Sequence, residues 1–354
     1  MTGLETPELY VTNFNPRFTG VSATAAALAG RQAKHYRLQL VGRPLPGLGP
    51  PISWRRAVAL SRRVPAERPF ALWHVRRNAE MLAALYVRDV LRRPIRIVFT
   101  SAAIRTHSAV PRWLISRMDA VVATGEAAAA LVPHVASVVP HGVDTERFGP
   151  VADRTPLLAA LGLDARVAIG AIGRVRPEKG TDLFVEAMCR CLPRHPDAVA
   201  LVVGAWKAEH AAFKAGLDQR IRAGGLEGRI RFLGEVPSED MPRLMAALSV
   251  LVAAPRYEGF GLTAIEAMSS ACAVVATETG AFPSVVVEGE TGYLVPVGDI
   301  DRLAGRIDDL LSARDRIAAF GAAGRRRAVE RLSIAEEMRG VAAVYERVWN
   351  GERF

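Results

Sequence analysis

The chain has 354 residues, half of them hydrophobic and 23% charged, with a net charge of +10. This length suits two domains of a soluble globular protein. The chain contains no run of roughly 18 apolar residues that would span a bilayer, and its polar first seven residues do not resemble a secretory signal. Three cysteines without metal-ligand spacing, Cys189, Cys191 and Cys272, fit a reducing cytoplasm.

The excess positive charge lies in the first half of the chain. Residues 1–150 hold 20 Lys and Arg against 9 Asp and Glu, whereas residues 151–354 hold 26 against 27. A basic half indicates an anionic partner, such as nucleic acid, an acidic membrane surface or a phosphorylated substrate. A solvated, arginine-rich surface explains the charge equally well, because the chain has only four lysines.

Short apolar strands alternate with helical patterns along the first half. The expected strands are residues 9–12, 37–41, 70–73, 95–99, 120–123 and 137–139. The expected helices are residues 22–30, 79–91, 113–118 and 126–131. This alternation predicts βαβ units and a parallel sheet, whose ligands bind at the carboxyl ends of the strands. Three polar clusters fall at such ends: residues 17–20, 74–78 and 100–101.

The alternation restarts after residues 144–165, a stretch rich in Pro, Gly, Asp and Arg. The next expected strands are residues 167–172, 199–203, 230–233, 250–253, 273–276 and 293–295. The next expected helices are residues 181–192, 209–223, 239–248, 264–270 and 300–311, with two or three more in 313–348.

We therefore predict an α/β fold of two doubly wound Rossmann-like domains that face each other across a cleft. The first domain covers residues 1–143, and residues 144–165 form a linker. The second domain covers residues 166–330, and a C-terminal helix within residues 331–354 crosses back to the first domain.

The stretch from Ala254 to Ala267 lies between a predicted strand and a predicted helix. It contains two glycines, Gly259 and Gly261, and two carboxylates, Glu258 and Glu266, separated by seven residues. A strand, a glycine-rich loop and a helix N-terminus form an anion-binding corner, because the first N–H groups of a helix have no acceptor within it.

Two other interpretations of this stretch stay open. Gly259-x-Gly261-x-x-Ala264, followed by Glu278 after the next strand, matches a loose dinucleotide fingerprint, although residues 255–258 separate the strand from the first glycine. That match would indicate an NAD-dependent oxidoreductase. Thr263-x-x-Glu266 also matches a capping box, in which Glu266 only closes the helix N-terminus.

A second charged loop holds Arg174 and Lys179 between a predicted strand and a predicted helix. Two cations beside a helix N-terminus would clamp a diphosphate. The alternative is an ordinary surface loop in which Glu178 neutralises Lys179. Asp299-Ile300-Asp301 matches a metal-binding D-x-D pattern, but we interpret it as a helix start with Asp299 as N-cap. We therefore expect no metal and no cofactor.

Together these motifs resemble the family 4 retaining glycosyltransferases of the GT-B fold. The residues that carry the resemblance are Arg174, Lys179-Gly180, Glu258-Gly259-Phe260-Gly261-Leu262, Glu266, 140–144 and 291–295. The N-terminal segments 15–24, 73–78 and 99–101 are similar to a narrower subgroup, the mannosyltransferases of bacterial lipopolysaccharide core assembly, which use GDP-mannose.

The resemblance implies a role for each matching position. Arg174 and Lys179 would hold the donor diphosphate, Glu258 the transferred sugar and Glu266 the ribose, so that Glu258, Arg174 and Lys179 are the catalytic candidates. The other donor-binding candidates are Gly20, Phe232, Leu233, Gly259, Phe260, Gly261, Leu262 and Thr263. The candidates on the acceptor or sugar side are Arg17, His74, Arg76, Thr100, Ser101 and His107.

The first half departs from the family pattern at two places. Many members have two adjacent glycines where this chain has Thr19-Gly20, and many have a histidine where it has Thr100-Ser101. We expect that His74 or His107 substitutes for the missing histidine.

The function that the resemblance implies is transfer of mannose from GDP-mannose to a lipopolysaccharide inner-core acceptor, with retention of the anomeric configuration. The implied partners are a nucleotide sugar and an anionic glycolipid, and the basic first half would dock peripherally on the inner face of the cytoplasmic membrane. We expect no nucleic-acid partner, because the basic residues are not interleaved with aromatics. The alternatives are a non-catalytic, nucleotide-binding assembly factor and the NAD-dependent oxidoreductase.

Overall fold

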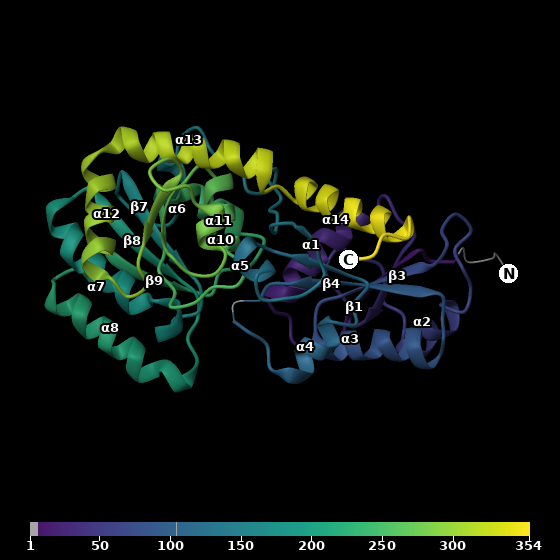
Figure 1. The fold of residues 1–354 in the computed structure, drawn as a ribbon. Helices are drawn as coiled ribbons and strands as arrows, with labels where there is room; N and C mark the ends of the chain where they lie inside the picture. The colour runs from purple at the N-terminus through teal and green to yellow at the C-terminus, as the bar shows by residue number, and fades with distance from the viewer. Residues whose placement is uncertain (1–5, 104) are drawn as a thin grey trace. The chain divides into compact units, whose positions relative to one another are not determined.

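The computed structural model describes residues 6–103 and 105–354, so most of the polar N-terminal segment lies outside the described residues. The chain forms two compact units (Figure 1). Unit 1 runs to Gly142 and also contains Ile334–Phe354, and unit 2 is Val143–Ser333. The expected linker, residues 144–165, is instead part of unit 2. It forms helix α6 (Thr155–Ala160) and buries Phe148 and Leu163, because its apolar side chains complete a hydrophobic core.

Unit 1 contains a six-stranded parallel sheet in the order β2-β1-β3-β4-β5-β6. Its strands are β1 (Leu9–Asn13), β2 (Leu38–Gly42), β3 (Ala71–Val75), β4 (Ile95–Ser101), β5 (Ala120–Ala123) and β6 (Val135–Val138). Its first helices are α1 (Gly20–Gln32), α2 (Trp54–Leu60), α3 (Asn78–Leu85), α4 (Ala109–Ile115) and α5 (Glu126–Ala129). The inner strands are nearly continuous apolar runs because helices cover both faces of the sheet.

The last helix of the chain, α14 (Ile334–Trp349), belongs to unit 1 and is drawn in yellow in Figure 1. It packs against α1, and its Val341, Val344 and Val348 share one apolar cluster with Leu9 and Leu28. The C-terminal helix therefore completes the core of the N-terminal unit.

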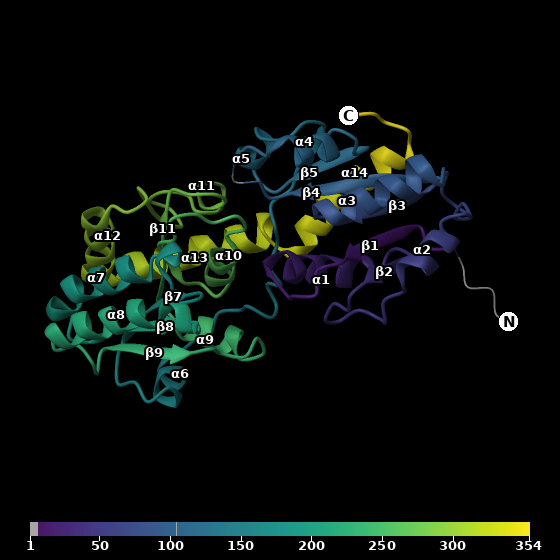
Figure 2. The same ribbon diagram turned by 90° about the horizontal axis from the view of Figure 1, so that it is seen from below.

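Unit 2 contains a second six-stranded parallel sheet, in the order β12-β11-β10-β7-β8-β9. Its strands are β7 (Val167–Ile172), β8 (Ala198–Val203), β9 (Ile230–Gly234), β10 (Val250–Ala253), β11 (Ala273–Thr277) and β12 (Gly292–Val295). Its further helices are α7 (Thr181–Cys191), α8 (Ala211–Ala223), α9 (Met241–Ala247), α10 (Leu262–Ser269), α11 (Phe282–Val285), α12 (Ile300–Ser312) and α13 (Arg314–Arg331). Helices α7, α8 and α12 cover one face, α9 and α10 cover the other, and α13 contributes to the apolar clusters on both; Figure 2 shows α8 lying along β8 and β9.

Each sheet has one point where the strand order reverses. In unit 2 the chain moves outward from β7 through β8 to β9, and then returns to the other side of β7 as β10. In unit 1 the reversal falls between β1 and β3. In doubly wound folds the loops that leave such neighbouring strands diverge to opposite faces and leave a crevice for a ligand.

Candidate functional site

The two motif loops of unit 2 leave neighbouring strands at the point where the strand order reverses. The first connects β7 to α7 and contains a 3₁₀ turn, Pro177–Lys179, and the second connects β10 to α10. Because β7 and β10 are parallel neighbours, both loops emerge at the carboxyl edge of the sheet. The strand order therefore unites two motifs that lie about 80 positions apart in the sequence.

Gly180 allows the two loops to lie against each other. Its φ is +69°, and a Cβ at this position would lie 1.8 Å from the backbone oxygen of Ala254, so only glycine fits there. Arg256 links the loops further, since its N–H donates to the Glu178 carbonyl at 2.9 Å and its guanidinium bonds the Asp182 carboxylate at 2.7 and 3.1 Å. The sequence did not point to Arg256, whose partners lie in the other loop and in the first turn of α7.

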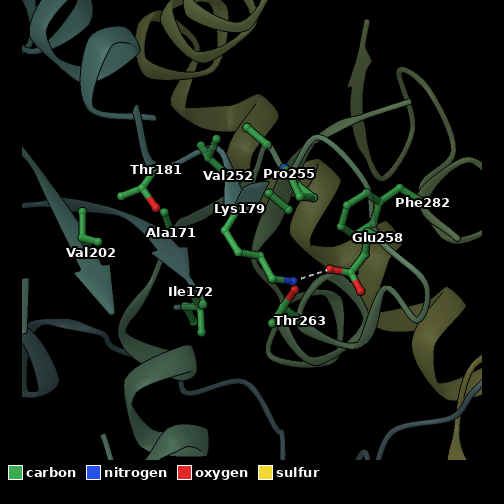
Figure 3. A pocket seen from close by; sticks show the side chains of 13 residues that line it. Ala171, Ile172, Lys179, Thr181, Val202, Val252, Pro255, Glu258, Thr263 and Phe282 are labelled. Atoms are coloured by element: carbon green, nitrogen blue, oxygen red, sulfur yellow. Dashed lines mark hydrogen bonds and ion pairs between the residues drawn. The ribbon is translucent and has the colours of Figure 1, made fainter. Parts of the chain in front are cut away.

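Lys179 and Glu258 meet in a pocket at this junction (Figure 3). The ammonium Nζ of Lys179 donates to Glu258 Oε2 at 2.7 Å. The other carboxylate oxygen of Glu258 accepts the N–H groups of Gly259 and Phe260 at 3.1 and 3.2 Å. Lys179 therefore pairs with Glu258, and the alternative in which Glu178 neutralises Lys179 is wrong. Glu178 lies instead 3.7 Å from the Arg176 guanidinium.

The end of β11 and the loop that follows it hold the backbone around Glu258 in place. Gly280 has a φ of +57°, and a Cβ there would lie 1.3 Å from the backbone oxygen of Glu258. The Thr277 hydroxyl donates to the Pro255 carbonyl at 2.8 Å. The backbone that carries the carboxylate is thus held on two sides before any ligand binds.

Helix α10 begins earlier than the sequence pattern predicted. Gly261, with a φ of +68°, is its N-cap, and Leu262 is its first residue. Thr263 is then inside the helix and lines the pocket beside Lys179 (Figure 3). The capping-box interpretation is therefore wrong, because no side chain caps this helix. The first N–H groups of α10 have no acceptor in the helix and can meet an anion.

Glu266 lies in the second turn of α10 and is half-buried. Burial raises the pKa of its carboxyl to about 7, against a smaller opposite effect of the Arg147 charge. No hydrogen bond reaches this carboxylate from the part of the chain that the structure describes. Glu266 does not line the pocket that holds Lys179 and Glu258. It therefore has free acceptor capacity for the hydroxyls of a ligand.

The remaining donor-side candidates lie outside that pocket. Arg174 is exposed in the loop after β7, and it forms no ion pair with any described residue. Phe232 and Leu233 are on β9, the edge strand of the unit 2 sheet, and pack on opposite faces of it. The Lys214 ammonium lies 3.9 Å from the centre of the Phe232 ring.

In unit 1 the predicted residues fall into buried and exposed groups. His74 is fully buried on β3, where its Nε2 lies 2.6 Å from the Thr100 hydroxyl oxygen. Ser101 is also buried, whereas Arg17 is exposed. Gly20 is the first residue of α1, and His107 lies in the loop before α4 rather than on a helix.

Two more residues of unit 1, which were not among the predicted site residues, organise its strand ends. The buried Glu80 carboxylate accepts from the Thr12 hydroxyl at 3.0 Å and from the N–H groups of Phe14 and Arg76 at 3.2 and 2.9 Å. Arg77 donates to Glu80 at 3.1 Å and also reaches Asn13, Thr19 and Ser22. The sequence signal for Glu80 was its position, since it is a carboxylate in the first turn of a helix that directly follows a strand.

Local contacts show the roles of the two aspartates in the Asp299-Ile300-Asp301 pattern. Asp299 is the N-cap of α12, because its carboxylate accepts the Arg302 N–H at 2.9 Å, and Asp301 pairs with Arg190. The cysteines are buried free thiols. Within residues 6–103 and 105–354, no group of three or more His, Cys, Asp and Glu side chains is arranged to hold a metal ion.

Comparison with known proteins shows that this sequence is similar to glycosyltransferases. The chain is 41% identical over 350 residues to the lipopolysaccharide core biosynthesis mannosyltransferase LpsB of Rhizobium meliloti, covering 98% of this chain and 99% of that protein. Residues 160–327, almost all of unit 2, match the model of the glycosyl transferases group 1 family. The chain belongs to this glycosyltransferase family. A second relative, mannosyltransferase LpcC of Rhizobium leguminosarum bv. viciae, is 39% identical over 356 residues and covers 100% of both chains.

Solved structures confirm the fold class expected for this glycosyltransferase. The structure of Anabaena Alr3699/HepE in complex with UDP has a TM-score of 0.84 at 19% identity, covering 96% of this chain and 99% of that one. The C-terminal domain of a group 1 glycosyl transferase (LpcC) from Francisella tularensis is 36% identical, with a TM-score of 0.53, and covers 55% of this chain and 100% of its own. The α/β fold with two Rossmann-like units is that of the GT-B enzymes, and the oxidoreductase interpretation is wrong.

Proposed function

We propose that this glycosyltransferase moves mannose from GDP-mannose to an inner-core acceptor of lipopolysaccharide, with retention of the anomeric configuration. The full-length similarity to two lipopolysaccharide core mannosyltransferases supports the sugar and the acceptor class. The observation that carries the chemistry is the Lys179–Glu258 pair at the reversal point of the unit 2 sheet.

In this proposal the donor diphosphate replaces Glu258 as the partner of Lys179. Breaking the sugar–phosphate bond develops negative charge on the diphosphate, which Lys179, the exposed Arg174 side chain and the first N–H groups of α10 would stabilise by several kcal/mol. A diphosphate is a good leaving group, so no strong general acid is required. The chemistry would proceed without a bound metal ion or cofactor.

The two carboxylates would then have different roles. Glu258, released from Lys179 but still held by the N–H groups of Gly259 and Phe260, would accept hydrogen bonds from hydroxyls of the transferred sugar. Glu266, one turn into α10 and without a protein donor among the described residues, would accept the ribose hydroxyls.

For the acceptor we propose an anionic glycolipid on a membrane that unit 1 contacts. Residues 1–142 and 334–354 hold 22 Lys and Arg against 11 Asp and Glu. Exposed apolar side chains on α3, on the π-helical turn that follows it (Tyr86–Val90) and on α4 add to this charge and are called the α3–α4 surface: Leu82, Tyr86, Val90, Val110 and Trp113. The exposed arginines Arg92, Arg112 and Arg117 lie in the same segments. Apolar side chains bordered by arginines suit the interface of an anionic bilayer. No helix among the described residues is long and apolar enough to cross a membrane.

Two measurements test the proposal. A thermal-shift panel of GDP, UDP, ADP and NAD should show the largest stabilisation with GDP. A transfer assay with GDP-mannose and purified inner-core acceptor should then give a mannosylated product. A response to NAD alone would contradict the proposal, and a larger response to UDP would contradict its donor. GDP binding without transfer would support the non-catalytic assembly factor instead.

A further inference from the structure

Arg76 is a buried cation without a partner. It follows β3 at the reversal point of the unit 1 sheet, and only 9% of its surface is exposed. Its Nη1 is fully buried and has no hydrogen-bond acceptor among the described residues, and no ion pair with a described carboxylate forms at the guanidinium. Because a buried charge is costly unless it is paired, this arrangement needs an explanation outside the protein.

The nearby carboxylates form no hydrogen bond or ion pair with the Arg76 guanidinium and are bonded to other donors. Glu80 and Glu337 attract Arg76 electrostatically. The Glu80 oxygens, however, already accept bonds from backbone N–H groups, a hydroxyl and Arg77. The Glu337 oxygens accept from His141 Nδ1 at 2.9 Å and the Gly142 N–H at 2.8 Å. The Arg76 guanidinium therefore has no hydrogen-bond or ion-pair partner among the described residues.

A buried hydrogen-bond chain sets the orientation of the neighbouring Thr100. Gln32 Nε2 donates to the Tyr345 hydroxyl at 2.9 Å, and that hydroxyl is hydrogen-bonded to His74 Nδ1. His74 Nε2 lies within hydrogen-bond distance of the Thr100 hydroxyl, at 2.6 Å. In the tautomer that carries the proton on Nε2, His74 donates to Thr100 and leaves the Thr100 hydroxyl hydrogen available for a ligand.

Arg76 and Thr100 lie next to each other at the strand ends. Val75 on β3 is paired with Phe99 on β4, so the next residues along the two parallel strands are Arg76 and Thr100. Burial lowers the pKa of the His74 imidazole, which is bonded to Thr100, and the charge of Arg76 lowers it further. A cation beside a hydroxyl that can donate matches an anionic group.

We propose that Arg76 and Thr100 form a subsite for a carboxylate or phosphate group of the acceptor, with His74, Tyr345 and Gln32 as positioning residues. The assignment to the acceptor rests on the proposed function, whereas the preference for an anion rests on Arg76 itself. Tyr345 comes from α14, so the C-terminal helix has a role in the subsite as well as in the core.

A stability comparison separates a ligand subsite from a structural role. If only a ligand pairs the charge of Arg76, replacing Arg76 by an apolar side chain of similar length removes an unpaired buried charge. Arg76→Met should then melt about 2–4 °C or more above the wild type in the absence of ligand. Arg77→Met is the matched control, because it removes a guanidinium bonded to four side chains, and it should melt below the wild type.

Binding is tested with three probes at constant ionic strength: galacturonate, galactose 6-phosphate and neutral galactose. The wild type should be stabilised by one or both anionic sugars and not by galactose, and the responding sugar tells a carboxylate subsite from a phosphate subsite. Arg76→Met should lose this response, and Thr100→Val should reduce it several-fold. All variants should keep the wild-type response to GDP, since GDP is assigned to unit 2.

Three results would overturn the subsite. In the first, Arg76→Met melts below the wild type or fails to fold. In the second, Arg76→Met and the wild type respond equally to the anionic sugars. In the third, the wild type responds equally to galactose and to its anionic derivatives. A failure of the proposed function would differ from these, because it would appear as a missing response to GDP while the anion response persisted.

Discussion

The Lys179 ammonium and the Glu258 carboxylate form an ion pair of 2.7 Å where two loops of unit 2 meet. A donor diphosphate that takes Lys179 would release Glu258 for the sugar, so one contact connects leaving-group stabilisation with sugar binding.

Lys179→Ala should abolish most of the activity while leaving the fold intact. We expect the transfer rate to fall about 10²–10³-fold, the loss seen when one preorganised donor to a developing charge is removed. The melting temperature should change by no more than about 2–4 °C, because Lys179 is about one-third exposed. Lys207→Ala, an exposed lysine of the same unit, is the control and should retain full activity. Wild-type activity of Lys179→Ala would remove Lys179 from the mechanism.

Gly180→Ala should destabilise unit 2 by about 3 kcal/mol or more, because the new Cβ overlaps the Ala254 carbonyl and the residue keeps a positive φ. Gly216→Ala is the matched control. Gly216 lies in α8 with open space around it, so alanine should stabilise the helix by about 0.5–1 kcal/mol. Urea denaturation of both variants measures the difference, and equal effects would contradict the close approach of the two loops.

Glu266 should make donor binding depend on pH. Burial raises the pKa of its carboxyl to about 7 in the folded protein, so this group is mostly protonated at pH 6 and mostly ionised at pH 8. If the ionised form accepts the ribose hydroxyls, the affinity for GDP-mannose should rise roughly tenfold over this interval. Calorimetric titration of Glu266→Gln should give a weaker affinity that is independent of pH, whereas a flat wild-type profile would exclude the ribose role.

The same carboxyl should affect stability in the opposite direction. A carboxyl whose folded-state pKa is raised destabilises the protein once it must ionise, between the unfolded-state value near 4.5 and the folded value near 7. Glu266→Gln should therefore be more stable than the wild type at pH 8 and equally stable near pH 4, which denaturant melts at the two pH values would show.

The α3–α4 surface should bind anionic vesicles. Trp113→Ala should weaken sedimentation with phosphatidylglycerol vesicles at low salt several-fold, because an aromatic side chain at the interface is lost. Trp206→Ala is the control, since Trp206 is an exposed tryptophan of unit 2. Equal binding of the wild type to neutral and anionic vesicles would contradict the docking surface.

Transfer should survive exhaustive treatment with EDTA. Lys179, Arg174 and the N–H groups of α10 are assigned to the leaving group, so no divalent ion is needed to neutralise it. A loss of activity that added Mg²⁺ or Mn²⁺ restores would show that a metal ion takes part.

Local sequence was enough to predict the alternation of strands and helices, the two motif loops and the glycosyltransferase family. Buried parallel strands are short apolar runs, and a loop at a strand end keeps its Gly, Lys and Glu within a few positions, so both leave a local signal. The Asp299 N-cap was predictable for the same reason, since the cap and the N–H that it accepts are three residues apart.

Only the tertiary structure decided which residues meet. Strand order is a long-range property, so the sequence could not show that β10 pairs with β7 and brings Glu258 to Lys179 in place of the adjacent Glu178. The return of α14 to unit 1 places Tyr345 beside His74, 271 positions away. The tertiary structure also leaves Arg76 buried without a partner among the described residues, because burial and pairing depend on every element that packs around a side chain.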